Sequence, residues 1–330
     1  MIRHHAPLMP ALLGLLGITF GVSLLVGAVW LRPQDLLPAL FTRPWPLAAL
    51  IVIDLRLPRA ILACLAGGSL GLAGAVLQGL TRNPLAEPGL LGVTTGAALG
   101  AVIALYFGLT AAGEIWGPVM GIVGALGASA RTFLLGRGGG ILSLILAGAA
   151  VSGLMSACIS VALNLAPNPY AAYEIMTWLM GSLVDRSWHH VLLVLPFVAG
   201  GAVLLAMTMR ALDALALGED QAMSLGINLE RLHVMVLGGT ALAVGATTAV
   251  TGAIGFVGLL APHLLRPFVA YQPGRLLAPS ALLGALLLLT ADILTRLIQI
   301  GPEIKLGVVM SLLGTPFFFW LVVRVRRSGP

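Results

Sequence analysis

Few residues in this sequence could carry covalent chemistry, and the most suggestive run contains a serine. Gly67-Gly68-Ser69-Leu70-Gly71 matches the G-x-S-x-G pattern in which serine hydrolases hold their nucleophile. That pattern acts only on a sharp turn between a strand and a helix. Here the run lies within a long apolar stretch, where small residues spaced by four allow helices to pack closely. We therefore interpret it as a packing motif and predict no catalytic residue.

Lysine usage excludes ATP hydrolysis through a phosphate-binding loop. That loop needs a lysine directly after a glycine, whereas the single lysine, Lys305, follows Ile304. The run Gly138-Gly139-Gly140 lacks the lysine and is typical of a flexible turn. We expect no ATP, magnesium or other cofactor in this chain and no enzymatic activity. Any energy from ATP has to come from another subunit.

The spacing of histidines and cysteines predicts no metal site. Cys64 and Cys158 lie in apolar runs, which argues against both a disulfide and metal ligation. The adjacent His189 and His190 are expected in an outer loop, where such a pair is more typical of solvated surface than of metal ligands. The role of the pair stays open.

Asp292 and Arg296 are the ionisable pair within an apolar segment. They are one helical turn apart, with the acid first, so they can form an ion pair. Ionisable residues inside a membrane are functional candidates by default. Mutual neutralisation is the alternative, and the sequence does not decide between the two.

Composition indicates that lipid surrounds most of the elements that carry these residues. Of 330 residues, 59% are hydrophobic and 9% charged, and the mean hydropathy is +1.03. A typical soluble domain has about 25% charged residues. Since one crossing takes roughly 20 apolar residues, we predict an all-α integral membrane protein of about ten transmembrane helices, with residues 1–330 forming a single transmembrane domain. The net charge of +6 indicates topology rather than nucleic-acid binding, and the arginine distribution favours both termini in the cytoplasm.

Gly, Pro and Arg divide the apolar stretches into ten expected helices. The second is too long for one perpendicular crossing, and the eighth is short and contains Pro262. A further short helix is expected near 173–183. The ten ranges are 8–31, 47–80, 91–109, 115–136, 141–165, 190–209, 231–252, 257–270, 278–298 and 306–324.

An internal echo suggests pseudo-symmetric halves. Gly74-Ala75-Val76 is followed by Pro84, and Gly252-Ala253-Ile254 is followed at the same spacing by Pro262. Two halves of similar build are typical of transporters with internal repeats.

The longest interior polar segment runs over about 210–231. Within it, Glu219 to Leu225 is expected to form a short helix, because acidic residues favour its N-terminal end and Gly226 can close it. Asn228 is expected to cap the following helix. The segment is interpreted either as an ordinary cytoplasmic loop or as a docking helix for a soluble partner.

Several motifs, in matching order over about residues 50–324, resemble the permeases of type II ATP-binding-cassette importers, the FecCD-like family that carries cobalamin, iron–siderophore complexes and haem. The motifs that carry the resemblance are Arg56-Leu57-Pro58-Arg59, the run from Gln78 to Gly92 with Asn83-Pro84-Leu85, Leu217-Gly218-Glu219, Gly252 to Leu259, Ala261-Pro262-His263, Ala291-Asp292 and Gly314-Thr315-Pro316.

The resemblance implies a homodimer in the bacterial inner membrane, with two ATPase subunits inside and a periplasmic substrate-binding protein outside. It also implies three sets of site residues. Arg56, Arg59 and Arg296 would dock the binding protein; Gly218, Glu219, Ala222, Leu225 and Gly226 would couple to the ATPase; and Asn83, Leu85, Ile141 and Leu142 would form the cytoplasmic gate. Relatives carry small hydroxyl residues where Ile141 and Leu142 stand, so this second gate element is altered here.

Two other classes remain as alternatives. An ion-coupled secondary transporter needs carboxylates near the bilayer midplane, and Asp292 is the candidate. An intramembrane enzyme would depend on Ser69 and scattered histidines. Within the importer interpretation, an iron chelate (haem or siderophore) is the expected cargo and cobalamin the alternative.

Overall fold

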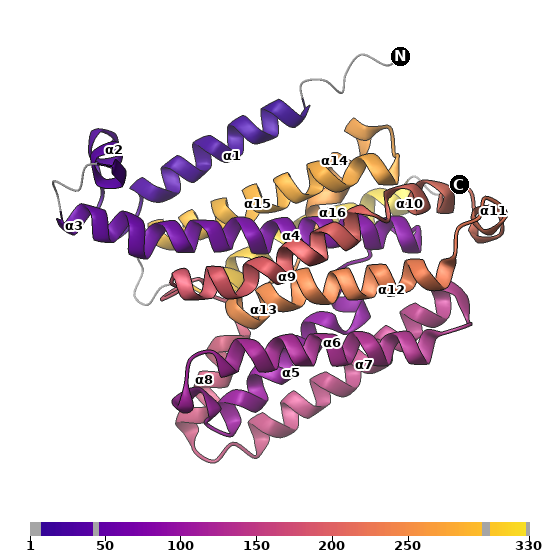
Figure 1. Cartoon of the computed structure of the whole chain (residues 1–330), viewed down its shortest axis with the longest axis horizontal. Coiled ribbons are helices and arrows are strands. Elements are labelled where there is room, and N and C mark those ends of the chain that lie inside the picture. The colour runs from indigo at the N-terminus through magenta and orange to yellow at the C-terminus, as the bar shows by residue number, and fades with distance from the viewer. Residues whose placement is uncertain (1–7, 42–45, 299–303, 328–330) are drawn as a thin grey trace.

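The computed structural model describes residues 8–41, 46–298 and 304–327 as an elongated bundle of helices (Figure 1). The described residues contain no strand. The helices are α1 (Leu8–Leu25), α2 (Pro33–Phe41), α3 (Pro46–Ala49), α4 (Leu57–Thr81), α5 (Val93–Tyr106), α6 (Trp116–Gly136), α7 (Gly140–Asn164), α8 (Pro169–Leu179), α9 (Trp188–Ala206), α10 (Met209–Leu215), α11 (Glu219–Ser224), α12 (Leu229–Thr240), α13 (Ala246–Thr251), α14 (Val257–Leu265), α15 (Pro273–Leu297) and α16 (Leu306–Arg327).

Seven described helical stretches are long and apolar enough to cross a membrane. One of them runs without a break from Leu47 to Thr81, because the π-helical turn η1 (Leu50–Arg56) joins α3 to α4. Three shorter apolar helices, at Val93–Tyr106, Val257–Val269 and Leu306–Phe319, accompany the seven. The all-α membrane class is therefore confirmed, whereas the count of ten crossings stays a prediction.

The first helix ends earlier than expected, at Leu25 rather than near residue 31. The reason is a side chain from elsewhere: Arg56 binds the last carbonyls of α1, and a Cβ added at Gly27 would lie 2.7 Å from its guanidinium. The sequence predicts a connection at residues 33–41, whereas the structure has the helix α2 there. The short helix expected near 173–183 is α8, which Asn168 caps by accepting the N–H of Ala171.

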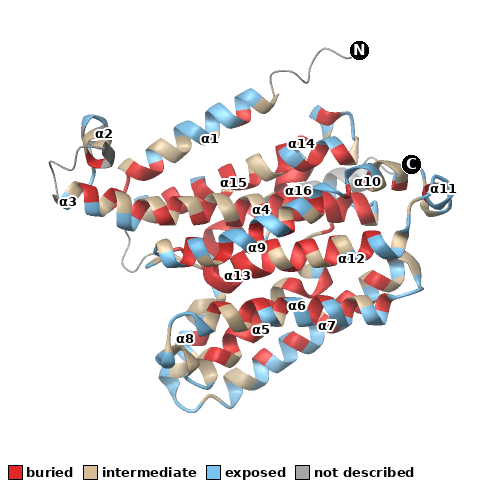
Figure 2. Cartoon of the chain, in the orientation of Figure 1, coloured by how far each residue is buried: buried red, intermediate tan, exposed pale blue. Residues whose placement is uncertain are grey.

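Two seams of small residues hold the centre of the bundle, where most residues are buried (Figure 2). On α4, Gly67 and Gly71 lie directly against the backbone of α15 at Gly284 and Ser280, and a Cβ at either glycine would collide with a carbonyl oxygen. Gly96 and Gly100 on α5 meet α6 in the same way. The packing interpretation of the G-x-S-x-G run is therefore confirmed.

The helical rod formed by α12 and α13 is interrupted before α14. α13 ends at Thr251, Gly252 has φ +74°, and Phe256 adopts the left-handed conformation at φ +67° before α14 begins. The freed backbone is partly satisfied by protein, since the N–H of Ser182 donates to the carbonyl of Thr251 at 2.7 Å. A cavity of about 560 Å³ adjoins this break and is lined by the end of α8 and by α16. Irregular backbone within a membrane is tolerated where it lines such a cavity.

Candidate functional site

The residues that the sequence singled out gather at the two opposite ends of the bundle. We call the end that carries Arg59 and Asp292 the arginine end, and the end that carries α11 the α11 end; they are left and right in Figure 1. α4 and α15 lie side by side and both run from one end to the other.

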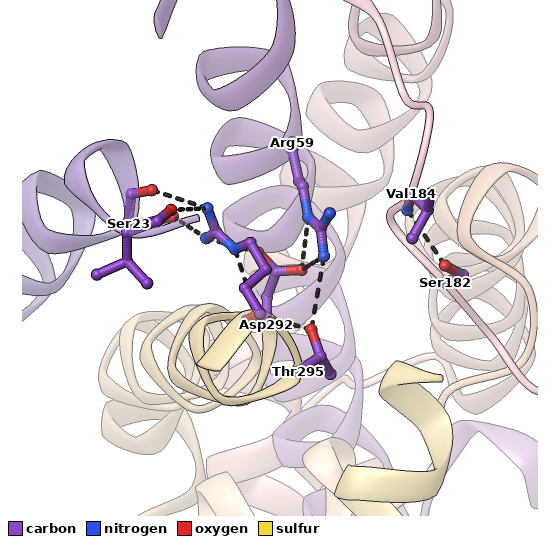
Figure 3. Close-up of polar contacts among 8 residues, drawn as sticks. Ser23, Arg59, Ser182, Val184, Asp292 and Thr295 are labelled. Carbon is purple, nitrogen blue, oxygen red and sulfur yellow. Dashed lines mark hydrogen bonds and ion pairs between the residues drawn. The ribbon is translucent and has the colours of Figure 1, made fainter. Parts of the chain in front are cut away.

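Asp292 is the centre of the arginine end (Figure 3). Its carboxylate binds the guanidinium of Arg59 at 2.9 Å and that of Arg296 at 2.8 Å. Arg59 also donates to the hydroxyl of Thr295 at 3.5 Å. The side chain of Asp292 is 1% exposed, against 14% for Arg59 and 7% for Arg296. The expected pair of Asp292 with Arg296 is confirmed, and one buried carboxylate serves two arginines.

Arg56 and Arg296 also close the end of α1. The last carbonyls of a helix have no partner within it. Arg56 donates to the carbonyls of Leu24 at 2.8 Å and Leu25 at 2.9 Å, and also binds that of Val29. Arg296 donates to the carbonyls of Ser23 and Val26 and to the Ser23 hydroxyl. These two cations therefore cap α1 and lie at the negative end of its dipole.

The structure thus brings together all three arginines of the predicted docking set, each engaged with its own chain. The guanidinium groups of Arg59 and Arg296 share the one carboxylate of Asp292, so the cluster has a net positive charge. A carboxylate arriving from outside has to compete with Asp292 for Arg59 and Arg296. The Arg59–Asp292 pair could not be predicted from local patterns, because the two residues are 233 positions apart.

At the α11 end, the polar segment folds much as expected. Glu219 and Asp220 start α11, Gly226 follows it with φ +85°, and the Asn228 side chain accepts the N–H of Arg231 at 2.9 Å. Gly218, which precedes α11, has φ +120° and so adopts a conformation that side chains disfavour. The helix, its closing glycine and the cap on α12 are confirmed.

The members of the predicted coupling set differ in accessibility. Ala222 is fully buried against its own chain, whereas Leu225 is 64% exposed. Leu217 and Met223 are exposed beside it. The exposed apolar surface at α11 therefore consists of Met223 on the helix and of Leu217 and Leu225 on either side of it, and Ala222 anchors α11 from within.

The predicted gate residues lie on two connections at the same end. α4 ends at Thr81, Arg82 takes the left-handed conformation at φ +50°, and the Asn83 side chain accepts the N–H of Leu85 at 2.9 Å to form a tight turn. The chain then returns toward the bundle, where the carbonyl of Leu91 accepts the Thr132 hydroxyl at 3.0 Å.

The second gate element forms the first turn of α7. Ile141 is 6% exposed and packs in the main core, whereas Leu142 is 69% exposed. The turn before it contains Gly138 and Gly140, both at positive φ. The two predicted gate elements are therefore a tight turn after α4 and a helix start after a glycine turn.

Acidic residues of the segment Met209–Arg231 touch three of the connections at this end. Asp213 accepts the N–H of Gly274 at 2.7 Å and the Gln272 amide at 3.2 Å, which caps the start of α15. Glu219 approaches Arg82 at 3.9 Å, and Glu230 binds Arg137 at 2.7 Å. Local patterns do not indicate the role of Asp213, because its partner Gly274 is 61 residues away.

The prediction of an outer loop at the histidine pair is wrong. His189 and His190 lie in the first turn of α9 rather than in a loop, and His190 is 6% exposed. Its ring and the Ser187 side chain form a capping box at the helix start, which explains the burial. Among the described residues there is no group of three or more His, Cys, Asp or Glu that could hold a metal ion.

The sequence profile of the FecCD transport family matches residues 15–324. The hemin transport permease HmuU of Yersinia pestis is 38% identical over 84% of this chain and 85% of its own. The vitamin B12 import permease BtuC of Vibrio cholerae is 38% identical over 96% and 94%.

A solved structure agrees with these relatives. A transporter of metal-chelate ABC type, in an inward-facing conformation, superposes with a TM-score of 0.85 at 32% identity, covering 95% of this chain and 98% of that one. The chain therefore belongs to the FecCD transport family, the permeases of type II ATP-binding-cassette importers.

Proposed function

We propose that this chain is the membrane-spanning subunit of an ATP-driven importer of iron chelates, haem or siderophore, in a bacterial inner membrane. The observation that supports this most is the match to the FecCD family over residues 15–324. The absence of a P-loop lysine agrees with a transport subunit whose ATP is hydrolysed elsewhere. Cobalamin is the alternative cargo, because the relatives include both a hemin and a vitamin B12 permease.

The two ends of the bundle suit two different partners. We assign the α11 end to the cytoplasm, in keeping with the positive-inside rule and with both termini inside. There Leu217, Met223 and Leu225 offer an apolar surface to an ATPase subunit. Gly218, Glu219, Ala222 and Gly226 would shape and position that surface.

The arginine end would face the periplasm and receive the substrate-binding protein. Arg56, Arg59 and Arg296 would dock it, because the planar guanidinium binds carboxylates bidentately. Of the three, Arg59 is the most accessible, at 14% exposure of its side chain. Docking would then proceed by exchange: a carboxylate of the binding protein would replace the Asp292 carboxylate as a partner of the Arg59 guanidinium.

Two copies of the chain would enclose the translocation path. The cavity of about 560 Å³ beside α8 and α16 is lined mainly by apolar residues and small side chains, as a path for a bulky chelate requires. Asn83, Leu85, Ile141 and Leu142 would close its cytoplasmic end. An ion-coupled transporter is less favoured, because Asp292, the carboxylate proposed for it, is already held by two arginines.

The test is transport by reconstituted vesicles that contain the chain, its cognate ATPase and its binding protein. A panel of haem, ferric siderophore and cobalamin is offered for uptake. Uptake should require ATP on the side of the membrane that carries the ATPase and the binding protein on the opposite side. Uptake driven by a proton or sodium gradient without ATP would overturn the proposal. A preference for cobalamin would retain the importer and change its cargo.

A further inference from the structure

The carboxylate of Glu219 occupies the junction of three elements. It starts α11, it lies 3.9 Å from the guanidinium of Arg82 at the end of α4, and a Cβ placed on Gly140 would be 3.2 Å from its Oε2. Its side chain is 29% exposed, so most of its surface is in contact with its own chain. Because Gly140 starts α7, one carboxylate touches both connections that carry the predicted gate residues.

The backbone at both contacts of Glu219 is tightly turned. Arg82 is in the left-handed conformation and directly precedes Asn83, whose side chain holds the N–H of Leu85. Gly140 is also at positive φ and directly precedes Ile141. For a non-glycine residue such as Arg82, this conformation is sparsely populated and persists where the surroundings determine it. A shift of the Glu219 carboxylate therefore acts on positions immediately adjacent to the gate residues.

The Arg82–Glu219 ion pair is weak enough to break and re-form. At 3.9 Å, with the Arg82 side chain 49% exposed, it is a weak surface ion pair. The neighbouring contacts of the same segment are closer: Asp213 accepts the Gly274 N–H at 2.7 Å and Glu230 binds Arg137 at 2.7 Å. The Asp213 contact thus holds the segment at α15 more firmly than the Arg82–Glu219 pair holds it at α4. The Glu230–Arg137 pair, with both side chains more than half exposed, is another weak surface ion pair.

We infer that Glu219 is a positioning residue that joins α11 to both parts of the inner gate, through Arg82 on one side and the Gly140 turn on the other. Movement of α11 then changes the position of Leu85 through Arg82 and Asn83. The inference rests on the proposed function, because it takes the ATPase as the source of that movement. It differs from a role in which Glu219 contacts the ATPase directly.

The experiment uses the full reconstituted complex and a thiol reporter at the gate. Leu85→Cys is introduced into a background with Cys64→Ser and Cys158→Ser. Labelling by a membrane-impermeant maleimide is timed without nucleotide and with a non-hydrolysable ATP analogue. We expect a rate ratio of about five or more between the two states, the lower bound of typical coupling between sites. In Glu219→Arg the ratio should fall to about one.

Charge exchange separates the two roles of Glu219. The double variant Arg82→Glu/Glu219→Arg restores an opposite-charge pair and should recover at least half of the background ratio. Asp220→Arg, the same charge change at the adjacent exposed position, is the matched control and should keep the ratio. Co-purification of the ATPase is measured for every variant. If a charge-reversal variant does not assemble with the ATPase, the single variants Glu219→Gln and Arg82→Gln replace it. Each of these two should lower the ratio of labelling rates.

Three results would overturn the inference. They are a background ratio of one, a background ratio retained in Glu219→Arg, and a loss in Glu219→Arg that the charge exchange does not repair. The last result would place Glu219 on the ATPase. Failure of the proposed function is recognised separately, as a lack of ATP-dependent uptake by the wild-type complex.

Discussion

At the scale of single residues, Asp292 is the group on which the arginine end depends. It is buried, and it is the counter-charge of both Arg59 and Arg296. Removing one partner of a buried ion pair is strongly destabilising, because it leaves an uncompensated charge. Arg296 has further acceptors in the carbonyls of α1, but a carbonyl does not neutralise its charge.

The first prediction follows for Asp292→Asn. We expect it to destabilise the purified chain by about 3–5 kcal/mol, the typical cost of breaking a buried pair. Thermal unfolding in detergent, followed by tryptophan fluorescence, measures the change. Asp220→Asn, an exposed acid that also loses one charge, serves as the control and should unfold at the wild-type temperature. Equal melting temperatures for the two variants would refute the role of Asp292.

A second prediction concerns docking at Arg59. Because Arg56 and Arg296 also cap α1, replacing either would disturb the fold, whereas Arg59 contacts Asp292 and Thr295. Arg59→Gln avoids placing a second carboxylate beside Asp292. We expect binding-protein association to weaken at least about tenfold, which is 1.4 kcal/mol. Surface plasmon resonance on nanodisc-embedded complex measures it, with Arg131→Gln on α6 as the exposed control. Unchanged affinity in Arg59→Gln would exclude the docking role.

At the scale of elements, the bundle is organised by the seam between α4 and α15. Gly67 and Gly71 allow backbone to lie on backbone there, so the two helices approach more closely than larger residues permit. This proximity carries Arg59 on α4 to Asp292 on α15. The seam is thus what turns two distant stretches of sequence into one charged cluster.

The third prediction is that Gly71→Ala destabilises the chain by about 1–3 kcal/mol, the typical cost of overpacking. A single methyl at this position would meet the carbonyl of Ser280 and force the helices apart. Gly127→Ala on α6 is the matched control, since a Cβ there meets nothing within 4 Å. Yield of monodisperse protein and thermal unfolding distinguish the variants. Equal stability of both would contradict the close approach.

At the scale of the whole molecule, the sequence contains no P-loop. The single lysine, Lys305, lacks the glycine that a P-loop requires before it. The fourth prediction is that the isolated chain, rigorously purified, shows no magnesium-dependent ATP hydrolysis above a detergent blank. Hydrolysis should rise only when the cognate ATPase is added. Activity that co-elutes with the chain alone and is sensitive to magnesium removal would contradict it.

Local patterns were readable from the sequence, and distant pairs were not. The Asn228 cap and the Gly67/Gly71 packing motif depend on spacing within one helix or its end, so the sequence alone predicted them. The Arg59–Asp292 pair and the Asp213 cap on α15 join segments that only the fold brings together. The prediction that His190 lies in an exposed loop is wrong, because its ring is buried in a capping box at the start of α9.

The way α1 is held has a consequence for biosynthesis. α1 is translated well before one of its two anchors, because Arg296 lies 273 positions after Ser23. The nascent protein therefore carries α1 without its full attachment until α15 has been translated. Asp292 and Arg296 enter the bilayer on that same helix as an ion pair one turn apart, which lowers the cost of inserting both charges. α1 is thus made long before both of its anchors are in place.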